Sequence, residues 1–214
     1  GFISKLSTEG DVIHLEWVTG LDAPKGMGVN NGKLYVTNID EIVEIDIEGG
    51  TISNRYPLEG AKFANDIAIN KEGVVFATDM SVGRVYSLKD GNAKVWLESD
   101  KLKSPNGLFT TENELMIGID GAVLKAAYGS DQLTEHIPNT GGIDGLEAVD
   151  DEYFIKSDWV GHIHLIHPEK EKLLLLNTAD DNIQAADIEY VPELKMLFVP
   201  TFHDNRVTAY ELKM

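Results

Sequence analysis

An internal repeat of about 40 residues recurs five times and constrains the fold of this chain more than any other feature. Equivalent residues of successive repeats are 38 to 42 positions apart. The repeats open with Pro24–Val29, Ala64–Ile69, Pro105–Phe109, Ile143–Ala148 and Ala186–Tyr190. Each opening leads through a turn into a second apolar run, namely Lys33–Asn38, Val74–Asp79, Glu114–Gly118, Glu152–Ser157 and Lys195–Thr201. A period of this length made only of strand-like runs is typical of a β-propeller with one four-stranded blade per repeat.

The strands within a repeat are marked by short runs of β-branched and aromatic residues between Gly, Asn and Asp clusters. In the second repeat these runs are 67–69, 74–78, 84–88 and 94–97, and in the third they include 115–119, 122–127 and 132–137. No segment has the pattern of an amphipathic helix. We therefore expect an all-β fold that forms one domain over residues 1–214.

The first residues of the chain match the later part of a repeat. Residues 1–10 parallel 83–91, and 13–18 parallel 94–97, which brings the expected number of strands to about 21. Two interpretations follow: a complete five-bladed propeller, or a six-bladed one whose first strands are absent from this chain. We expect six blades. An incomplete ring would expose strand edges, which predicts self-association through those edges.

Charge and composition narrow the classes of partner. The formal net charge is −18, and such an acidic surface repels the phosphate backbone of nucleic acids while it attracts cations. No apolar run reaches the roughly 20 residues that span a bilayer. The chain has no cysteine, which excludes disulfides and thiolate metal sites but leaves both cytoplasm and periplasm open as compartments.

Polar residues vary at one repeat position, where the innermost strand of each blade starts. This position holds Lys25, Asn65, Asn106, Asp144 and Ala186. In a propeller these strand starts meet at one mouth of the central channel, so the side chains of the two Asn and the Asp offer hard oxygen ligands for calcium, magnesium or manganese. The alternative is turn chemistry, because Asn and Asp are common where a turn enters a strand.

Three motifs on successive repeats carry a resemblance to a known family. Asn65-Asp66-Ile67, Ser104–Leu108 and Ile143–Leu146 resemble the gluconolactonase and senescence-marker-protein (regucalcin) family. The resemblance implies a six-bladed propeller that holds one divalent cation at the channel mouth and hydrolyses sugar lactones. It implies that Asn106 is a metal ligand, that Asp144 is a ligand and the general base, and that Asn65 contacts the substrate or completes the metal site. The implied cation is calcium, with zinc or magnesium as alternatives.

The chain departs from the family pattern at one ligand. The family's further ligand is a Glu two repeats ahead of the Asn-Asp motif, which would fall before Gly1, and one repeat ahead stands Lys25, which is no metal ligand. The leading interpretation is a metal-dependent hydrolase of a sugar lactone or related small ester. The alternative is a non-catalytic propeller, similar to NHL-type repeats, that binds a small ligand or a protein on its channel face.

Two other groups of residues carry weaker signals. His162 and His164 share a strand face at a spacing that zinc enzymes use, but they fall on the third strand of their blade and are interpreted as surface histidines. Trp159 lies in the loop that matches the one with His203 in the next repeat, and such loops can rim the channel mouth. Trp159 could stack on a sugar ring there, although packing between blades is the commoner use of a large aromatic side chain.

Overall fold

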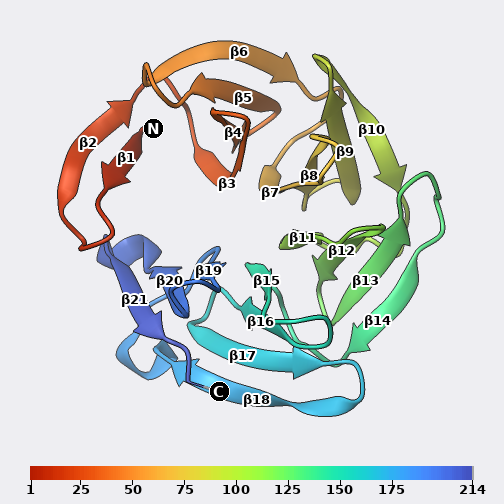
Figure 1. Cartoon of the computed structure of the whole chain (residues 1–214). Helices are drawn as coiled ribbons and strands as arrows, with labels where there is room; N and C mark the ends of the chain where they lie inside the picture. The colour runs from red at the N-terminus through yellow and green to blue at the C-terminus, as the bar shows by residue number, and fades with distance from the viewer. Residues whose placement is uncertain (214) are drawn as a thin grey trace. The chain divides into compact units, whose positions relative to one another are not determined.

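The strands of the computed structural model, which describes residues 1–213, pair into antiparallel sheets in the order of the sequence (Figure 1). The structure divides into two compact units, Gly1–Ser99 and Asp100–Met214. The described residues contain 21 strands, the number that the repeats predict, and two single-turn 3-10 helices. The expected strands Lys33–Asn38 and Ala122–Ala127 form with the predicted bounds.

The first unit contains one two-stranded and two four-stranded sheets. The two-stranded sheet pairs β1 (Ile3–Leu6) with β2 (Val12–Val18). The next sheet contains β3 (Pro24–Asn30), β4 (Lys33–Asn38), β5 (Glu41–Asp46) and β6 (Thr51–Pro57). The last contains β7 (Ala64–Ile69), β8 (Val75–Asp79), β9 (Arg84–Lys89) and β10 (Asn92–Glu98).

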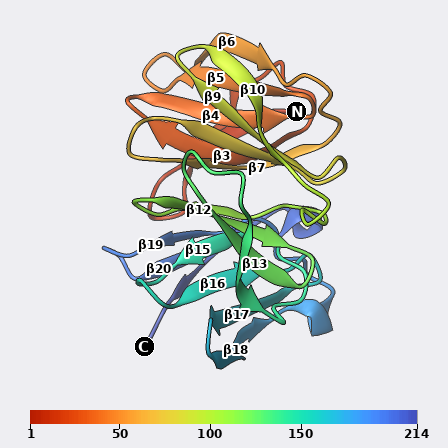
Figure 2. The same cartoon turned by 90° about the vertical axis from the view of Figure 1, so that its right-hand side faces the viewer.

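The second unit contains two four-stranded sheets and one three-stranded sheet. The first has β11 (Leu108–Thr110), β12 (Glu114–Ile119), β13 (Ala122–Ala127) and β14 (Thr134–Pro138). The second has β15 (Leu146–Ala148), β16 (Phe154–Ser157), β17 (His162–His167) and β18 (Lys170–Asn177), which lie one beside the next in Figure 2. After the helix η1 (Ala179–Asp181), the third has β19 (Glu189–Val191), β20 (Met196–Pro200) and β21 (Val207–Glu211), with the helix η2 (Phe202–Asp204) between β20 and β21.

Two hairpins show how turn residues fix the register of the sheets. Asn31-Gly32 joins β3 to β4 and Asp90-Gly91 joins β9 to β10, and all four residues have positive φ. Two-residue turns with positive φ at both positions match the twist of antiparallel strands, and Asn-Gly and Asp-Gly adopt them at low cost. The turns that the sequence marks are therefore the turns that form.

Apolar side chains fill the spaces between neighbouring sheets of each unit. In the first unit, Ile42, Ile67 and Tyr86 belong to a core shared by the sheets β3–β6 and β7–β10. In the second unit, Phe154 lies in the core between β11–β14 and β15–β18, and Ile188 in the core between β15–β18 and β19–β21. Burial of this apolar surface is the main term that stabilises the stacked sheets.

The expectation of six blades is not supported by residues 1–213. Four sheets have the full four strands of a blade, while β19–β21 form three and β1–β2 form two. The structure supports a five-bladed all-β arrangement instead. In the same range, no helix is long and apolar enough to cross a membrane.

Candidate functional site

The structure brings together two of the three predicted site residues. Asn106 and Asp144 both belong to the second unit, and the Asn106 Nδ2 donates a hydrogen bond of 2.9 Å to Asp144 Oδ1. Asn65 belongs to the first unit, where its Nδ2 lies 3.3 Å from the sulfur of Met80. Within the second unit, equivalent positions of two successive repeats are therefore in contact at the Asn106–Asp144 pair.

Backbone contacts just ahead of the innermost strands set the position of this pair. The Asn106 amide donates to Gly118 O, and the Asp144 amide donates to Ser157 O, both at 2.9 Å. Between the two segments stands Gly107, where an added Cβ would lie 2.7 Å from Asp144 O and 2.9 Å from the Leu146 Cβ. The repeated glycine thus permits the close approach that places the Asn106 amide against the Asp144 carboxylate.

A hydroxyl at the end of the second strand ties neighbouring repeats together in both units. Ser157 Oγ accepts a hydrogen bond from the Gly145 amide at 2.8 Å and donates one to Ala186 O at 2.7 Å. Thr78 Oγ1 accepts from the Asp66 amide at 3.0 Å, and Thr37 Oγ1 donates to Asn65 O. Sequence reasoning missed this contact, although a Thr or Ser at the end of the second apolar run recurs in three repeats.

The residue that follows this hydroxyl holds the loops beside the strand starts. Asn38 Oδ1 accepts from the amides of Asp22 and Ala23 at 2.9 and 3.0 Å. Asp79 does the same for Lys62 and Phe63 at 2.6 and 3.0 Å. Because these side chains satisfy backbone groups, they are turn residues rather than candidate ligands.

Burial raises the pKa of the Asp144 carboxyl to about 6. The hydrogen bond from Asn106 opposes this shift by stabilising the carboxylate, and the negative charge of Asp158 adds to it. No basic side chain among the described residues forms an ion pair with Asp144. A partly buried carboxylate with only a neutral partner is a group that a bound cation would stabilise.

A second carboxyl with a raised pKa, that of Glu147, lies three residues after Asp144 in the chain. The pKa of Glu147 rises to about 9, chiefly because the group is buried and also because Glu189 and Asp187 are negatively charged. Burial raises the pKa of Glu189 as well. Glu147 is therefore protonated at neutral pH, which explains how it can lie near Glu189 on β19 and near Asp187, which precedes that strand.

Lys25 occupies the equivalent position of the first repeat and has its own partners. Its Nζ donates to Ala23 O at 3.1 Å and lies 4.3 Å from the centre of the Phe63 ring. Burial lowers the pKa of its ammonium group. At this repeat position the first unit thus places a cationic side chain against an aromatic ring.

The oxygen atoms that Asn106 and Asp144 offer determine how well this part of the second unit could bind a metal ion. Asn106 and Asp144 offer oxygen atoms of the kind that calcium prefers, once the Asn106 amide turns its oxygen toward the site. Residues 1–213 contain no cluster of three or more His, Asp or Glu side chains that could hold a metal ion. The pair would thus supply two ligands, and water would have to complete the coordination shell.

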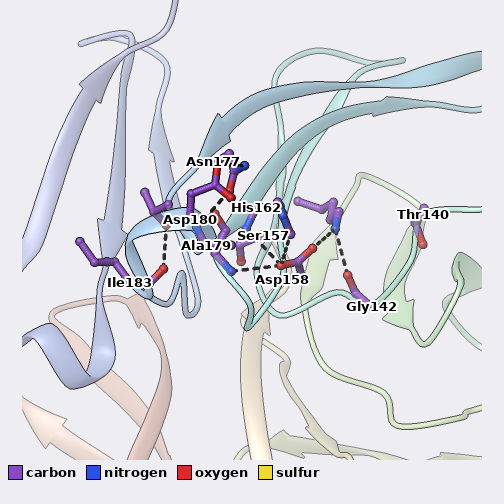
Figure 3. A network of polar contacts seen from close by, with 12 residues as sticks. Thr140, Gly142, Ser157, Asp158, His162, Asn177, Ala179, Asp180 and Ile183 are labelled. Atoms are coloured by element: carbon purple, nitrogen blue, oxygen red, sulfur yellow. Dashed lines mark hydrogen bonds and ion pairs between the residues drawn. The ribbon is translucent and has the colours of Figure 1, made fainter.

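His162 and His164, two of the three histidines of β17, have charged side chains nearby. Asp158 Oδ1 lies 3.2 Å from His162 Nδ1, and its other oxygen lies 3.0 Å from the buried Lys156 Nζ (Figure 3). The pKa of His164 falls to about 4 because the ring is buried and because Lys156 and Lys172 are nearby. The positive charge of Lys156 and Lys172 disfavours a further cation beside His164.

Comparisons with known proteins agree with the sheet arrangement. One chain of a nidogen/laminin complex superposes with a TM-score of 0.74 at 16% sequence identity, over 94% of this chain and 78% of that chain. A streptogramin B lyase gives a TM-score of 0.70 at 14% identity, over 96% and 70%. Virginiamycin B lyase from Staphylococcus aureus gives 0.66 at 14%, over 89% and 70%. This chain has the β-propeller fold.

The similarity of this propeller to those structures stops at the fold. Identities of 14 to 16% show a shared arrangement of blades and carry no function across. No protein-family model and no curated protein matches the sequence. The resemblance to the gluconolactonase family therefore stays a prediction, and function has to be argued from the site.

Proposed function

We propose that this propeller is a metal-dependent hydrolase of a sugar lactone or a related small ester, with one divalent cation, calcium, held by Asn106 and Asp144. The observation that carries the proposal is the contact between these two side chains. It joins an amide to a partly buried carboxylate that has no cationic partner among the described residues. Such a pair supplies oxygen ligands and one negative charge to an incoming cation.

The two carboxylate oxygens of Asp144 can serve different roles, one as the acceptor for Asn106 and the other as a base toward a water molecule. Its Oδ1 receives the Asn106 hydrogen bond, and no described residue donates to its Oδ2. A carboxylate whose pKa lies near 6 is mostly ionised at pH 7 and is a better base than an exposed Asp. Asp144 can therefore orient a water molecule and accept its proton. A divalent cation, when bound, polarises the ester carbonyl and stabilises the charge that develops on its oxygen.

The resemblance implies that Asn65 contacts the substrate, and we retain that role as part of the proposal. Among the described residues, the one hydrogen-bond partner of the Asn65 side-chain amide is the Met80 sulfur, and a thioether is a weak acceptor. The Asn65 side chain can exchange this partner for a substrate hydroxyl at small cost. We expect the substitution Asn65→Ala to raise KM and to change kcat little.

A calorimetric titration of the whole chain with calcium, and separately with zinc, tests the metal site. We expect one cation per chain for the wild type and loss of that binding in Asp144→Ala and Asn106→Ala. Cleavage of glucono-1,5-lactone should then depend on the cation and on Asp144. If the folded wild type takes up neither metal, the hydrolase proposal fails.

A second function has one specific observation in its favour. The side chains of Trp159 and Phe202 are 46% and 55% exposed and contact each other in loops of the second unit. Exposed aromatic side chains are frequent at binding surfaces, and one of the structures superposed above is a chain of a protein complex, that of nidogen with laminin. A non-catalytic propeller that binds a ligand through these loops is therefore the alternative.

A further inference from the structure

The second unit exposes an aromatic cluster on two neighbouring loops, which we name the aromatic corner: Trp159, Phe202 and His203. The Trp159 and Phe202 rings lie 4.6 Å apart, centre to centre, at 66°, and the Phe202 and His203 rings lie 4.7 Å apart at 83°. The Trp159 and Phe202 side chains remain 46% and 55% exposed, so the corner is accessible despite these contacts.

The loop that carries Trp159 is held in place on both sides. Asp158 Oδ1 accepts hydrogen bonds from the amides of Gly161 and His162 at 3.2 and 3.1 Å, and Asp158 Oδ2 pairs with Lys156, which is 1% exposed. Asp158 lies at the centre of this network in Figure 3. Gly161 has φ +121° and no room for a Cβ beside Ile183 O, so the chain is fixed just after Trp159.

The loop that carries Phe202 is held under strain. Phe202 has φ +43°, a conformation that bulky residues rarely adopt. The turn is closed by Thr201, whose Oγ1 accepts from the Arg206 amide at 3.1 Å, and by an Asp204–Arg206 ion pair at 2.6 Å. Backbone strain of this kind is found mainly where a side chain must be held for function.

A chain of hydrogen bonds places the aromatic corner on the same edge of the second unit as Asp144. The Asp144 amide donates to Ser157 O, the Ser157 hydroxyl donates to Ala186 O, and the Ala186 amide donates to Pro200 O. Trp159 follows Ser157 by two residues, and Phe202 follows Pro200 by two. All these segments therefore end on the edge of the sheets where Asp144 lies.

We propose that the aromatic corner binds the apolar face of a sugar ring whose ester or lactone group reaches Asp144. The inference rests on the proposed function, because it adds a ring-binding subsite to the same site. A sugar ring suits this surface because its C–H face packs on an aromatic ring while its hydroxyls reach the polar loop groups. The subsite would select cyclic substrates over open-chain esters.

Binding of methyl β-D-glucopyranoside, which carries no lactone bond, tests the subsite separately from hydrolysis. We would measure it by saturation-transfer NMR for the wild type, Trp159→Ala, Trp159→Phe and Phe202→Ala. Trp159→Ala should weaken binding by about tenfold and Trp159→Phe by less, because a smaller ring still stacks. Leu173→Ala is the control, since Leu173 is 59% exposed on β18, the outermost strand of its sheet, and its loss should change nothing.

Asp144→Asn separates the two proposals. It should abolish cation binding and hydrolysis but leave glucopyranoside binding within about twofold, because it changes no aromatic contact. Sugar binding without hydrolysis in the wild type would retain the subsite and reject the hydrolase. Equal binding by wild type and Trp159→Ala, or no binding of the sugar by the folded wild type, would overturn the subsite.

Discussion

Asp144 combines two properties that oppose each other, a charge suited to a cation and a position that disfavours that charge. Its pKa rises from an ordinary 3.8 to about 6 because the group is buried. Between these two values the folded chain binds a proton that the unfolded chain has released. Stability therefore falls as the pH rises from about 4 to about 6, and the loss persists above pH 6.

Asp144→Asn should consequently stabilise the metal-free chain at pH 8 by up to about 3 kcal/mol and change little at pH 4. Asn keeps an oxygen for the Asn106 amide, so the hydrogen bond survives while the charge is removed. Urea unfolding at both pH values, with a chelator present, measures the difference. An equal effect at pH 4 and pH 8 would show that Asp144 does not titrate in this range.

At the scale of the element, the glycines at the starts of the inner strands set the spacing between repeats. A Cβ on Gly145 would lie 2.5 Å from the Ile188 amide nitrogen and 2.9 Å from Asp187 Oδ1. Backbone cannot move aside as a flexible side chain can, so the two segments would have to separate. Gly142, three residues earlier, has no atom within 4 Å of an added Cβ.

Gly145→Ala should therefore destabilise the chain by about 3 kcal/mol, whereas Gly142→Ala should stay within about 0.5 kcal/mol of the wild type. Thermal or urea unfolding of the two single variants gives the comparison. Similar stabilities would mean that the inner strands are not in the close contact described. Gly145→Ala should also weaken cation binding, since it shifts the residue next to Asp144.

Strands and turns follow from local patterns, which is why the sequence predicts them well. Alternating apolar residues and Asn-Gly or Asp-Gly turns define Lys33–Asn38 and the hairpins around it without help from distant residues. The Asn106–Asp144 contact was predictable for a different reason, because the repeat period aligns the two positions. The role of Ser157 was not, since a hydroxyl that joins Gly145 to Ala186 has no local signature.

Phe202, in the aromatic corner, is another residue whose role could not be predicted from the local sequence. Nothing near it in the sequence indicates a positive φ, and its contact with Trp159 joins two residues that are 43 positions apart in the chain. The number of blades could not be predicted from local patterns either. The repeats predict the number of strands correctly, but the way in which the first and last strands combine into sheets depends on strand pairing, which has no local signature.

At the scale of the whole molecule, a net charge of −18 is the dominant electrostatic feature. Self-repulsion of this size destabilises a folded chain and is reduced by salt. Two sequence-based expectations remain predictions at this scale: that residues 1–214 form one domain, and that the chain self-associates through strand edges. The outer strand β18 exposes Leu173, Leu174 and Leu175, and exposed apolar residues on an edge strand favour self-association.

Salt and calcium should stabilise the molecule by separable routes. In a buffer of about 10 mM ionic strength the Debye length is about 30 Å, so sodium chloride at 0.5 M should raise Tm of the wild type and of Asp144→Asn alike. Calcium at about 1 mM adds little screening but, at 100 times its Kd, adds about 2.7 kcal/mol by binding to the folded chain. That increment should raise Tm by several degrees in the wild type only. If Asp144→Asn gains as much from calcium as the wild type does, the cation acts on the acidic surface as a whole, and the assignment of a discrete site to Asn106 and Asp144 is wrong.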